Sequence, residues 1–280
     1  MAIGDHAHVA PLRDGRVASD RLAIEFVDIA PLPRAFRQFV RDDTIDIAEL
    51  AVVTHLLACQ YRRPIRGLAI PLWSRLPHTN LVCPAHSALS NPGDLAGGTV
   101  GVRAYAQTSG VWVRGVLQHE YGVDLDTVMW GTMEDAHLPE YRDPSSAYRC
   151  APTPPLRDRM LAGEFDAIMG ERVVDPRQVR SVIPGAEAAA LAWIDRSGIQ
   201  PINHILAART EQLDAHPWLA KELMALFEEA RRIAVADGAP PPPTYGMEAC
   251  AASLQRCFDY SFEQAITPQR HAVADFFEPI

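Results

Sequence analysis

The chain has 280 residues, of which 48% are hydrophobic, so it can bury a large core and is long enough for one large or two medium domains. Its formal net charge of -9 argues against a broad basic surface for nucleic acid or an anionic membrane. Five cysteines without a CxxC pair suggest neither a disulfide framework nor a cysteine zinc site. With no signal-like start and no apolar run of membrane-spanning length, we expect a cytoplasmic protein.

The first part of the chain alternates strands with helices. We predict strands at 2–4, 22–27, 45–50, 68–73 and 79–83, and helices at 33–40 and 54–60. This alternation indicates an α/β domain with a sheet rich in parallel strands. The shift to Ser, Asn, Pro and Gly between 84 and 94 then marks a connection to another domain.

A second α/β unit follows, and its most informative segment is a strand, a short loop and a helix. We predict strands at 99–103, 127–130 and 166–169, helices at 109–121 and 155–162, and a long loop over 134–155. Thr108 and Ser109 are favoured N-cap residues, and a helix start offers unpaired N–H groups at the positive end of the helix dipole. The segment suits a carboxylate or phosphate, and an ordinary capped helix is the alternative.

The last part returns the chain to the first domain. The elements predicted there are a strand at 201–207, helices at 216–236 and 247–265, and a polyproline spacer at 239–243. We therefore predict a first lobe made of 1–83 and 201–280 and a second lobe made of 84–200. Two α/β lobes joined by two crossings leave a cleft, where small-molecule sites are preferentially found.

The histidines near the start are the first candidate site residues. His6 and His8 are two apart on a predicted strand, so both side chains face the same side. Together with Asp5 they could hold a divalent cation such as zinc, manganese or iron, or act as general acids. The alternative is that they face solvent or pack on one another.

Other candidates lie at strand ends. Arg75 and His78 follow a strand, where a loop could carry both side chains over the cleft. The alternative is that Arg75 forms a surface ion pair and His78 is solvated. His204 lies in an apolar strand, either as a catalyst or as a satisfied core residue. Glu49 and Glu171 close apolar strands, where burial would raise the carboxyl pKa and keep an acid protonated.

Each of these carboxylates could instead pair with an arginine, which for Glu171 includes its neighbour Arg172. Arg114 lies on the helix at 109–121, whose apolar pattern belongs to the core, and we expect its side chain to be solvated.

Two stretches resemble the type II periplasmic-binding-protein fold, Asp94-Leu95-Ala96-Gly97-Gly98-Thr99-Val100-Gly101-Val102 and Leu161-Ala162-Gly163-Glu164-Phe165-Asp166-Ala167. The whole chain resembles more closely the 4,5-dihydroxyphthalate decarboxylase family, which is built on that scaffold. The segments that carry this resemblance are Gly4-Asp5, Asp46-Ile47-Ala48-Glu49, Ile70-Pro71 with Ser74-Arg75 and His78, Val111-Trp112-Val113-Arg114-Gly115, Glu120-Tyr121-Gly122-Val123, Pro201-Ile202-Asn203-His204, His216-Pro217-Trp218, Tyr245-Gly246 and Thr267-Pro268.

The resemblance implies a two-lobed α/β fold, non-oxidative loss of CO2 from a hydroxylated aromatic carboxylate, and binding of a substrate carboxylate by Arg75. The chain departs from the expected family pattern at His6-Ala7-His8 and at Met247-Glu248-Ala249-Cys250. Both departures could touch the cleft and alter the substrate.

We therefore predict a decarboxylase of a phthalate-like acid. The predicted proton-transfer residues are His6, Glu49, His78 and His204. The predicted substrate-binding residues are Asp5, Arg75, Tyr105, Thr108, Ser109 and Glu171. We predict no cofactor other than a divalent metal ion, for which Asp5, His6 and His8 are the candidate ligands.

Two alternatives remain open, a solute-binding protein for a small organic anion and another small-acid lyase or dehydratase on the same scaffold. The predicted partner is a small aromatic carboxylate, without nucleic acid or membrane, and the sequence leaves a homo-oligomer open.

Overall fold

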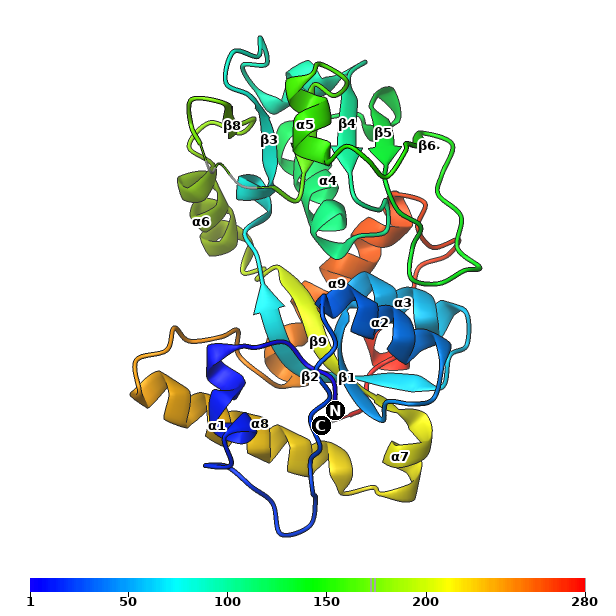
Figure 1. Ribbon diagram of the computed structural model, residues 1–280, viewed down its shortest axis with the longest axis vertical. Coiled ribbons are helices and arrows are strands. Elements are labelled where there is room, and N and C mark those ends of the chain that lie inside the picture. Colours follow the sequence, from blue (N-terminus) through cyan, green and yellow to red (C-terminus); the bar gives the residue numbers. More distant parts are fainter. Residues whose placement is uncertain (172, 174, 280) are drawn as a thin grey trace. The chain divides into compact units, whose positions relative to one another are not determined.

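The computed structural model describes residues 1–279 apart from 172 and 174, and the chain divides into two compact units (Figure 1). Unit 1 consists of Met1–Ser74, Ile202–Gln255 and His271–Ile280, and unit 2 consists of Arg75–Pro201 and Arg256–Arg270. These boundaries differ from the predicted lobes at two places. The strand predicted at 79–83 pairs within unit 2, and residues 256–270 also pack there.

Unit 1 contains a three-stranded sheet in the order β1 (Ile47–Ala51), β9 (Ile202–Arg209), β2 (Ile65–Ser74). The central strand β9 is antiparallel to both neighbours, so the prediction of a sheet rich in parallel strands is wrong for this unit. The chain passes from β1 through a helix, α3, to β2, and the two strands point in the same direction, as predicted. The returning strand β9 inserts between them, and this insertion is a long-range pairing that local patterns do not show.

Helices complete unit 1. They are α1 (Ala10–Arg13), α2 (Leu32–Arg41), α3 (Val52–Gln60), α7 (Thr210–Ala215), α8 (Leu219–Ala236) and the first part of α9 (Met247–Glu263), with 3-10 turns at Ala7–Val9 and Val273–Asp275. Helix α8 buries Leu223, Phe227 and Ala230, which recur at helical spacing. They pack in one core cluster with Leu68 and Leu206 of the sheet.

Two predicted strands near the start do not form. Of residues 2–4, only Ala2 makes an isolated bridge, to Ala48. Residues 22–27 form no strand, although Val27 N–H donates to Met1 O. The alternating Leu22, Ile24 and Phe26 lie against the core cluster of unit 1, so burial explains their pattern without a strand.

Unit 2 contains a six-stranded mixed sheet in the order β6-β5-β4-β7-β3-β8. The strands are β3 (Leu81–Pro84), β4 (Thr99–Val102), β5 (Met129–Thr132), β6 (Ala147–Arg149), β7 (Ala167–Met169) and β8 (Val179–Ser181). Strands β6, β5, β4 and β7 are parallel, whereas β3 is antiparallel to β7 and β8. The predicted loop over 134–155 contains β6, which is too short to leave a sequence pattern.

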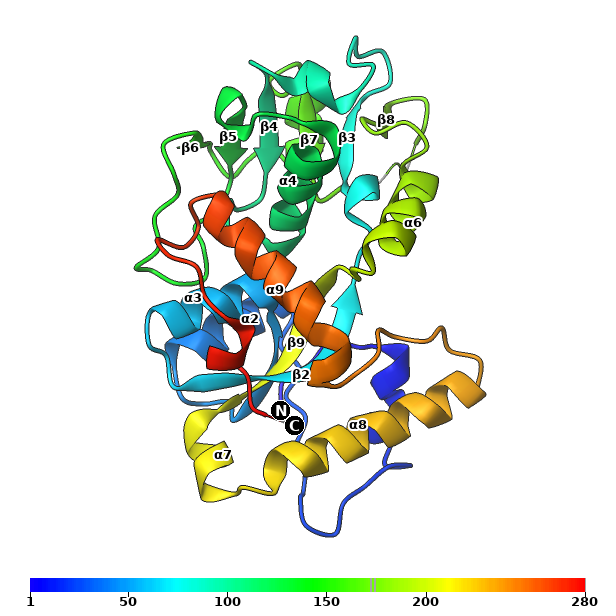
Figure 2. The same cartoon turned by 180° about the vertical axis from the view of Figure 1, so that it is seen from behind.

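The described residues of unit 2 form helices α4 (Thr108–Tyr121), α5 (Leu156–Leu161) and α6 (Ala186–Ser197), with 3-10 turns at Pro77–Asn80, Pro92–Leu95 and Leu125–Thr127. Helix α4 ends at Gly122 in the left-handed conformation that favours glycine. The later part of α9 crosses α4 at Gly115, where a Cβ would lie 2.0 Å from the Tyr260 ring (Figure 2). Only glycine allows this contact, which ties residues 256–270 to unit 2.

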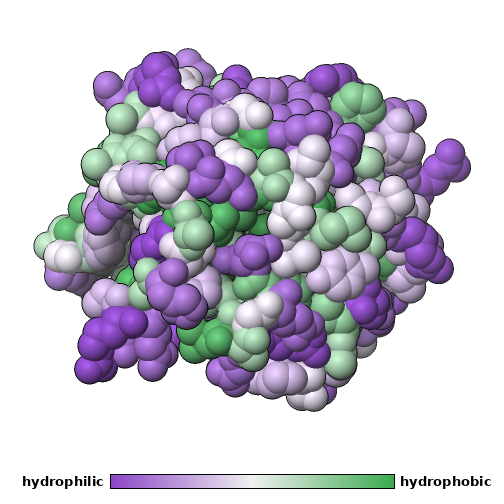
Figure 3. Space-filling model, turned by 90° about the horizontal axis from the view of Figure 1, so that it is seen from above, coloured by the Kyte–Doolittle hydropathy of each residue, from purple (hydrophilic) through white to green (hydrophobic). Residues whose placement is uncertain are grey.

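Within the described part of the chain, no helix combines the length and apolarity that a membrane span requires. The face shown in Figure 3 mixes hydrophilic and hydrophobic residues.

Candidate functional site

A buried carboxylate lies between two histidines in unit 1. Glu49, in the middle of β1, is 0% exposed, and its carboxylate accepts three hydrogen bonds. Gly4 N–H donates to Oε2 at 2.8 Å, His6 Nε2 lies 2.8 Å from Oε2, and His204 Nδ1 lies 2.6 Å from Oε1. We call Glu49, His6 and His204 the His–Glu–His cluster.

The sheet positions His204. It lies opposite Ala51 in β1 and Trp73 in β2, so it is the diagonal cross-strand neighbour of Glu49 on the same face. The Trp73 ring lies 4.7 Å from the imidazole, and Phe36 of α2 meets it edge-on at 5.0 Å. These contacts orient the ring while 15% of the side chain stays exposed.

The opening segment positions His6. His6 has an extended backbone just before the 3-10 turn at Ala7–Val9, and its ring stacks on His8 at 5.4 Å with 20° between the planes. His8 is buried, and burial lowers its pKa to about 4, so it is neutral at neutral pH. His6 therefore lies between a neutral ring and the Glu49 carboxylate.

Electrostatics keep Glu49 ionised. Burial alone would raise its pKa, but the hydrogen bonds from His204 and His6, together with their charges, lower the pKa below its ordinary value. The prediction that burial would keep Glu49 protonated as an acid is therefore wrong. Its role is that of an acceptor that orients both imidazoles.

This arrangement suits proton transfer. Because the nitrogens that face Glu49 are His6 Nε2 and His204 Nδ1, the opposite nitrogens, His6 Nδ1 and His204 Nε2, are left to exchange protons. An ionised carboxylate behind an imidazole selects its tautomer and fixes the orientation of the ring. The cluster can thus supply one acid and one base together.

Gly4 makes the cluster possible, and Gly4→Ala is expected to destabilise the protein by about 1–3 kcal/mol and to lower activity. A Cβ at this position would lie 2.9 Å from His6 Nε2 and 3.1 Å from Glu49 Oε2. Urea unfolding measures the effect. The matched control is Asp5→Ala next to it, which is exposed and should shift stability by less than about 0.5 kcal/mol. Equal effects of the two changes would contradict the steric argument.

In unit 2, four polar groups gather where β7 ends and α4 begins. Arg75 Nη1 donates to Gly170 O at 3.2 Å, and the Gln107 amide lies 3.7 Å from the position of a Cβ on Gly170. Gln107 Nε2 in turn donates to Ser109 Oγ at 2.8 Å. The structure therefore brings the predicted Arg75 and Ser109 to one edge of this sheet.

The start of α4 differs from the prediction. Its N-cap is Gln107, which has an extended backbone, whereas Thr108 and Ser109 are already helical and buried. Among the described residues, the Gln107 side chain makes no capping bond to the helix. The first turn of amides is therefore not capped by the hydroxyl groups that the sequence suggested.

His78 lies in the interior of unit 2. It is 1% exposed, with ring centroids 5.7 Å from Trp193 and 6.3 Å from Tyr121. Burial, followed by the charge of Arg196, lowers its pKa to about 4. A neutral buried imidazole is a poor proton donor at neutral pH, so we assign His78 to packing and leave it out of proton transfer.

The low pKa values of His8, His55 and His78, each about 4, make stability depend on pH. In the unfolded chain these histidines become protonated near pH 6.5, whereas in the folded chain they stay neutral down to about pH 4. The free energy of unfolding should therefore fall as the pH drops from about 6.5 to about 4.

His78→Phe keeps the aromatic packing, so it should make this fall shallower without loss of activity. Urea unfolding at a series of pH values measures it, with His86→Phe at an exposed position as the control. An unchanged slope in His78→Phe, or loss of activity in a folded variant, would contradict the assignment.

The other predicted residues fall in different places. Tyr105 is buried, and its hydroxyl donates to Gln264 O at 3.3 Å. Glu171 pairs with Arg157 at 3.0 Å, while its suggested partner Arg172 lies outside the described residues.

The metal candidates do not form a site. Asp5 is exposed, and His6 and His8 stack on each other. Among the described residues, no group of three or more His, Cys, Asp or Glu side chains is arranged to hold a metal ion.

Comparison with known proteins identifies the family. A 4,5-dihydroxyphthalate decarboxylase of Comamonas testosteroni is 30% identical over 254 residues, which are 84% of this chain and 75% of that protein. The chain belongs to the 4,5-dihydroxyphthalate decarboxylase family. A second protein of that name, from Pseudomonas putida, is 29% identical over 182 residues, 61% of this chain and 69% of its own length. No family model matches the chain.

This member of the 4,5-dihydroxyphthalate decarboxylase family has the periplasmic-binding-protein fold. The aliphatic sulphonate binding protein SsuA of Escherichia coli aligns over 100% of this chain and 92% of its own, with a TM-score of 0.63. At 14% sequence identity this likeness shows the fold alone. The predictions of family and fold from sequence are confirmed.

Sequence reasoning missed a residue of this decarboxylase-family member that the structure makes prominent. Arg114, expected to be solvated, is 0% exposed. The available signal was that residues from Thr108 to Leu117 carry almost no polar face, which indicates a helix buried all round.

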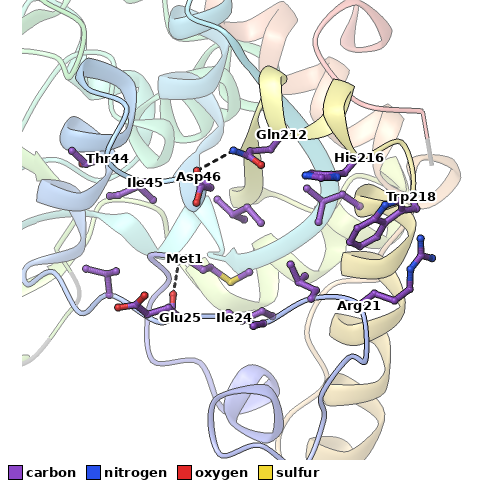
Figure 4. Close-up of a pocket in the computed structure, with 15 residues that line it drawn as sticks. Met1, Arg21, Ile24, Glu25, Thr44, Ile45, Asp46, Gln212, His216 and Trp218 are labelled. Atoms are coloured by element: carbon purple, nitrogen blue, oxygen red, sulfur yellow. Dashed lines mark hydrogen bonds between the residues drawn. The ribbon is translucent and has the colours of Figure 1, made fainter.

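The structure also contains a surface cavity of about 570 Å³ in unit 1, whose lining includes no member of the His–Glu–His cluster (Figure 4). There the Arg21 guanidinium lies 4.1 Å from the Trp218 ring, and Gln212 donates to Asp46 at 3.4 Å. Its lining shares no residue with the predicted site of this decarboxylase-family member.

Proposed function

We propose that this protein decarboxylates a hydroxylated phthalate-like acid without an oxidant, by protonating the ring carbon that carries the departing carboxylate. Membership of the 4,5-dihydroxyphthalate decarboxylase family supports the reaction class. The observation that carries the chemistry is the buried, ionised Glu49 between His6 and His204.

The reaction requires an acid and a base. Direct loss of CO2 from a benzene ring would leave an aryl carbanion without an electron sink. A hydroxyl group para to the departing carboxylate removes this difficulty, because the phenol can lose its proton and push electrons onto the carboxylated carbon. That carbon accepts a proton, the bond to the carboxylate breaks, and its electron pair restores the aromatic ring as CO2 leaves. The net change is one proton gained by the ring and one CO2 released.

The His–Glu–His cluster supplies both groups. One imidazole accepts the phenol proton, and the other donates a proton to the ring carbon. When CO2 leaves, the first imidazole returns its proton to the product phenolate. The second takes up one proton from solvent, which replaces the one that the ring gained. Glu49 stays ionised and stabilises whichever imidazole is charged.

Unit 2 supplies recognition of carboxylates in this proposal. Arg75, fixed through Gly170 O, presents a guanidinium that suits a carboxylate better than a lysine ammonium would. The idea that residues of both units line one pocket stays a prediction, testable by a crystal structure with a bound phthalate. We also propose a cytoplasmic location, which the five free thiols favour.

Incubation with 4,5-dihydroxyphthalate tests the reaction. The expected products are CO2 and 3,4-dihydroxybenzoate, and in D2O the carbon that lost its carboxylate should carry one deuterium. Phthalate, which lacks the hydroxyl groups, should bind without turnover. Inertness toward hydroxylated phthalates and benzoates, with or without added divalent metal, would contradict the proposal. Tight binding of these acids without turnover would favour a solute-binding protein.

A further inference from the structure

The guanidinium of Arg114 lies at the N-terminal end of α4. Arg114 is one turn beyond Gly110, and helical side chains lean toward the helix N-terminus. Its Nη2 therefore reaches Tyr105 O, ahead of the helix, at 2.6 Å, and its Nε donates to Gln264 Oε1 at 2.8 Å. The guanidinium carbon lies 4.0 Å from the centre of the Tyr105 ring.

This charge is buried and incompletely bonded. Arg114 is 0% exposed, and among the described residues its Nη1 has no hydrogen-bond partner. Its two bonds go to a carbonyl and an amide oxygen, both uncharged. The Asp143 carboxylate and the Tyr105 and Trp130 rings attract the charge, but no carboxylate among the described residues hydrogen-bonds to it. Buried arginines are normally paired with a carboxylate, because an uncompensated charge in the interior is costly.

The helix end adds to the imbalance. The first hydrogen bond within α4 runs from Val111 N–H to Gln107 O, so the earlier amides have no acceptor inside the helix. They form the positive end of the helix dipole, next to the positive guanidinium. Two positive groups at one buried position repel each other unless an anion lies between them.

Gly110 lets the guanidinium lie close against the first turn of α4. A Cβ on Gly110 would lie 3.2 Å from Arg114 Nη1, so a side chain at this position would press on that nitrogen. Gln107, Gly170 and Arg75 near this helix end are only partly buried, so we take theirs as the side from which a ligand would approach.

We propose that Arg114 Nη1 and the first turn of α4 bind the carboxylate that the aromatic substrate keeps, and that Gly110 makes this site possible. This rests on the proposed function and adds which residues hold the carboxylate that the phthalate-like acid keeps. A departing carboxylate becomes neutral CO2, so a strong cationic grip on it would favour the ground state over the transition state. The buried Arg114 therefore suits the retained group.

Calorimetric titration with phthalate and with uncharged catechol tests the site. Gly110→Ala should weaken phthalate binding by about 10- to 100-fold, as expected for a lost charge-assisted hydrogen bond, and leave catechol binding unchanged. Alanine favours a helix over glycine, whereas its Cβ would press on Arg114 Nη1, so the two effects on the melting temperature oppose each other and circular dichroism checks that the variant is folded. Arg114→Lys, which keeps the charge but not the planar donors, should also weaken phthalate binding, whereas the exposed control Arg196→Gln should not.

Unchanged phthalate affinity in a folded Gly110→Ala variant would overturn the inference, as would a wild-type protein that does not bind phthalate. These outcomes are separate from the proposed reaction, which is measured as CO2 release. Turnover of 4,5-dihydroxyphthalate with an unaffected Gly110→Ala variant would refute the site alone, and a Gly110-dependent phthalate affinity without turnover would refute the decarboxylase alone.

Discussion

Glu49→Gln is expected to lower kcat for decarboxylation by about 10²- to 10⁴-fold with little change in KM. The carboxylate accepts hydrogen bonds from His6 and His204 at the same time. An amide has one acceptor oxygen and one donor nitrogen, so it forces one of the two imidazoles into the opposite tautomer. That histidine then presents the wrong nitrogen for proton transfer.

The Glu49→Gln protein should remain folded, because the change removes a buried charge and preserves the shape of the side chain. Steady-state kinetics measure kcat and KM, and circular dichroism confirms the fold. The control is Glu228→Gln, a partly exposed partner of Arg231 in the same unit, which should keep full activity. A folded Glu49→Gln enzyme with near-normal kcat would refute the role of the cluster.

The second large effect is expected from replacing each histidine with the amide that copies only its bond to Glu49. In His204→Asn the amide nitrogen takes the place of Nδ1, and in His6→Gln it takes the place of Nε2. Both changes keep the hydrogen bond to the carboxylate but remove the outer nitrogen that exchanges protons. Each should lower kcat by about 10²- to 10⁴-fold and change KM much less.

The mismatched variants His204→Gln and His6→Asn provide the controls, because their amides do not reproduce the bonding position. They should lower both activity and melting temperature, whereas the matched variants should lower activity alone. If His204→Asn and His6→Gln kept their activity, the histidines would have only a structural role, and proton transfer would have to be assigned elsewhere.

The sequence by itself determined the family, the fold class and most regular elements of this protein. Helices such as α2 and α8 show apolar spacing that can be read along the chain, because one helix face is buried regardless of its partner. His6, Glu49 and His204 were each predicted as site residues from their strands and from the family resemblance.

Only the tertiary structure decided how these residues act together. Glu49 binds His204 because β9 inserts between β1 and β2, a pairing that joins positions 155 residues apart. It binds His6 because the opening segment of the chain returns to β1. This contact reverses the expected pKa shift of Glu49, since burial raises the pKa but the imidazoles lower it further. Likewise, Arg114 binds Gln264, which directly follows α9, and no local pattern on α4 shows that contact. Long-range pairing sets the environment of a charged group, and the environment sets its chemistry.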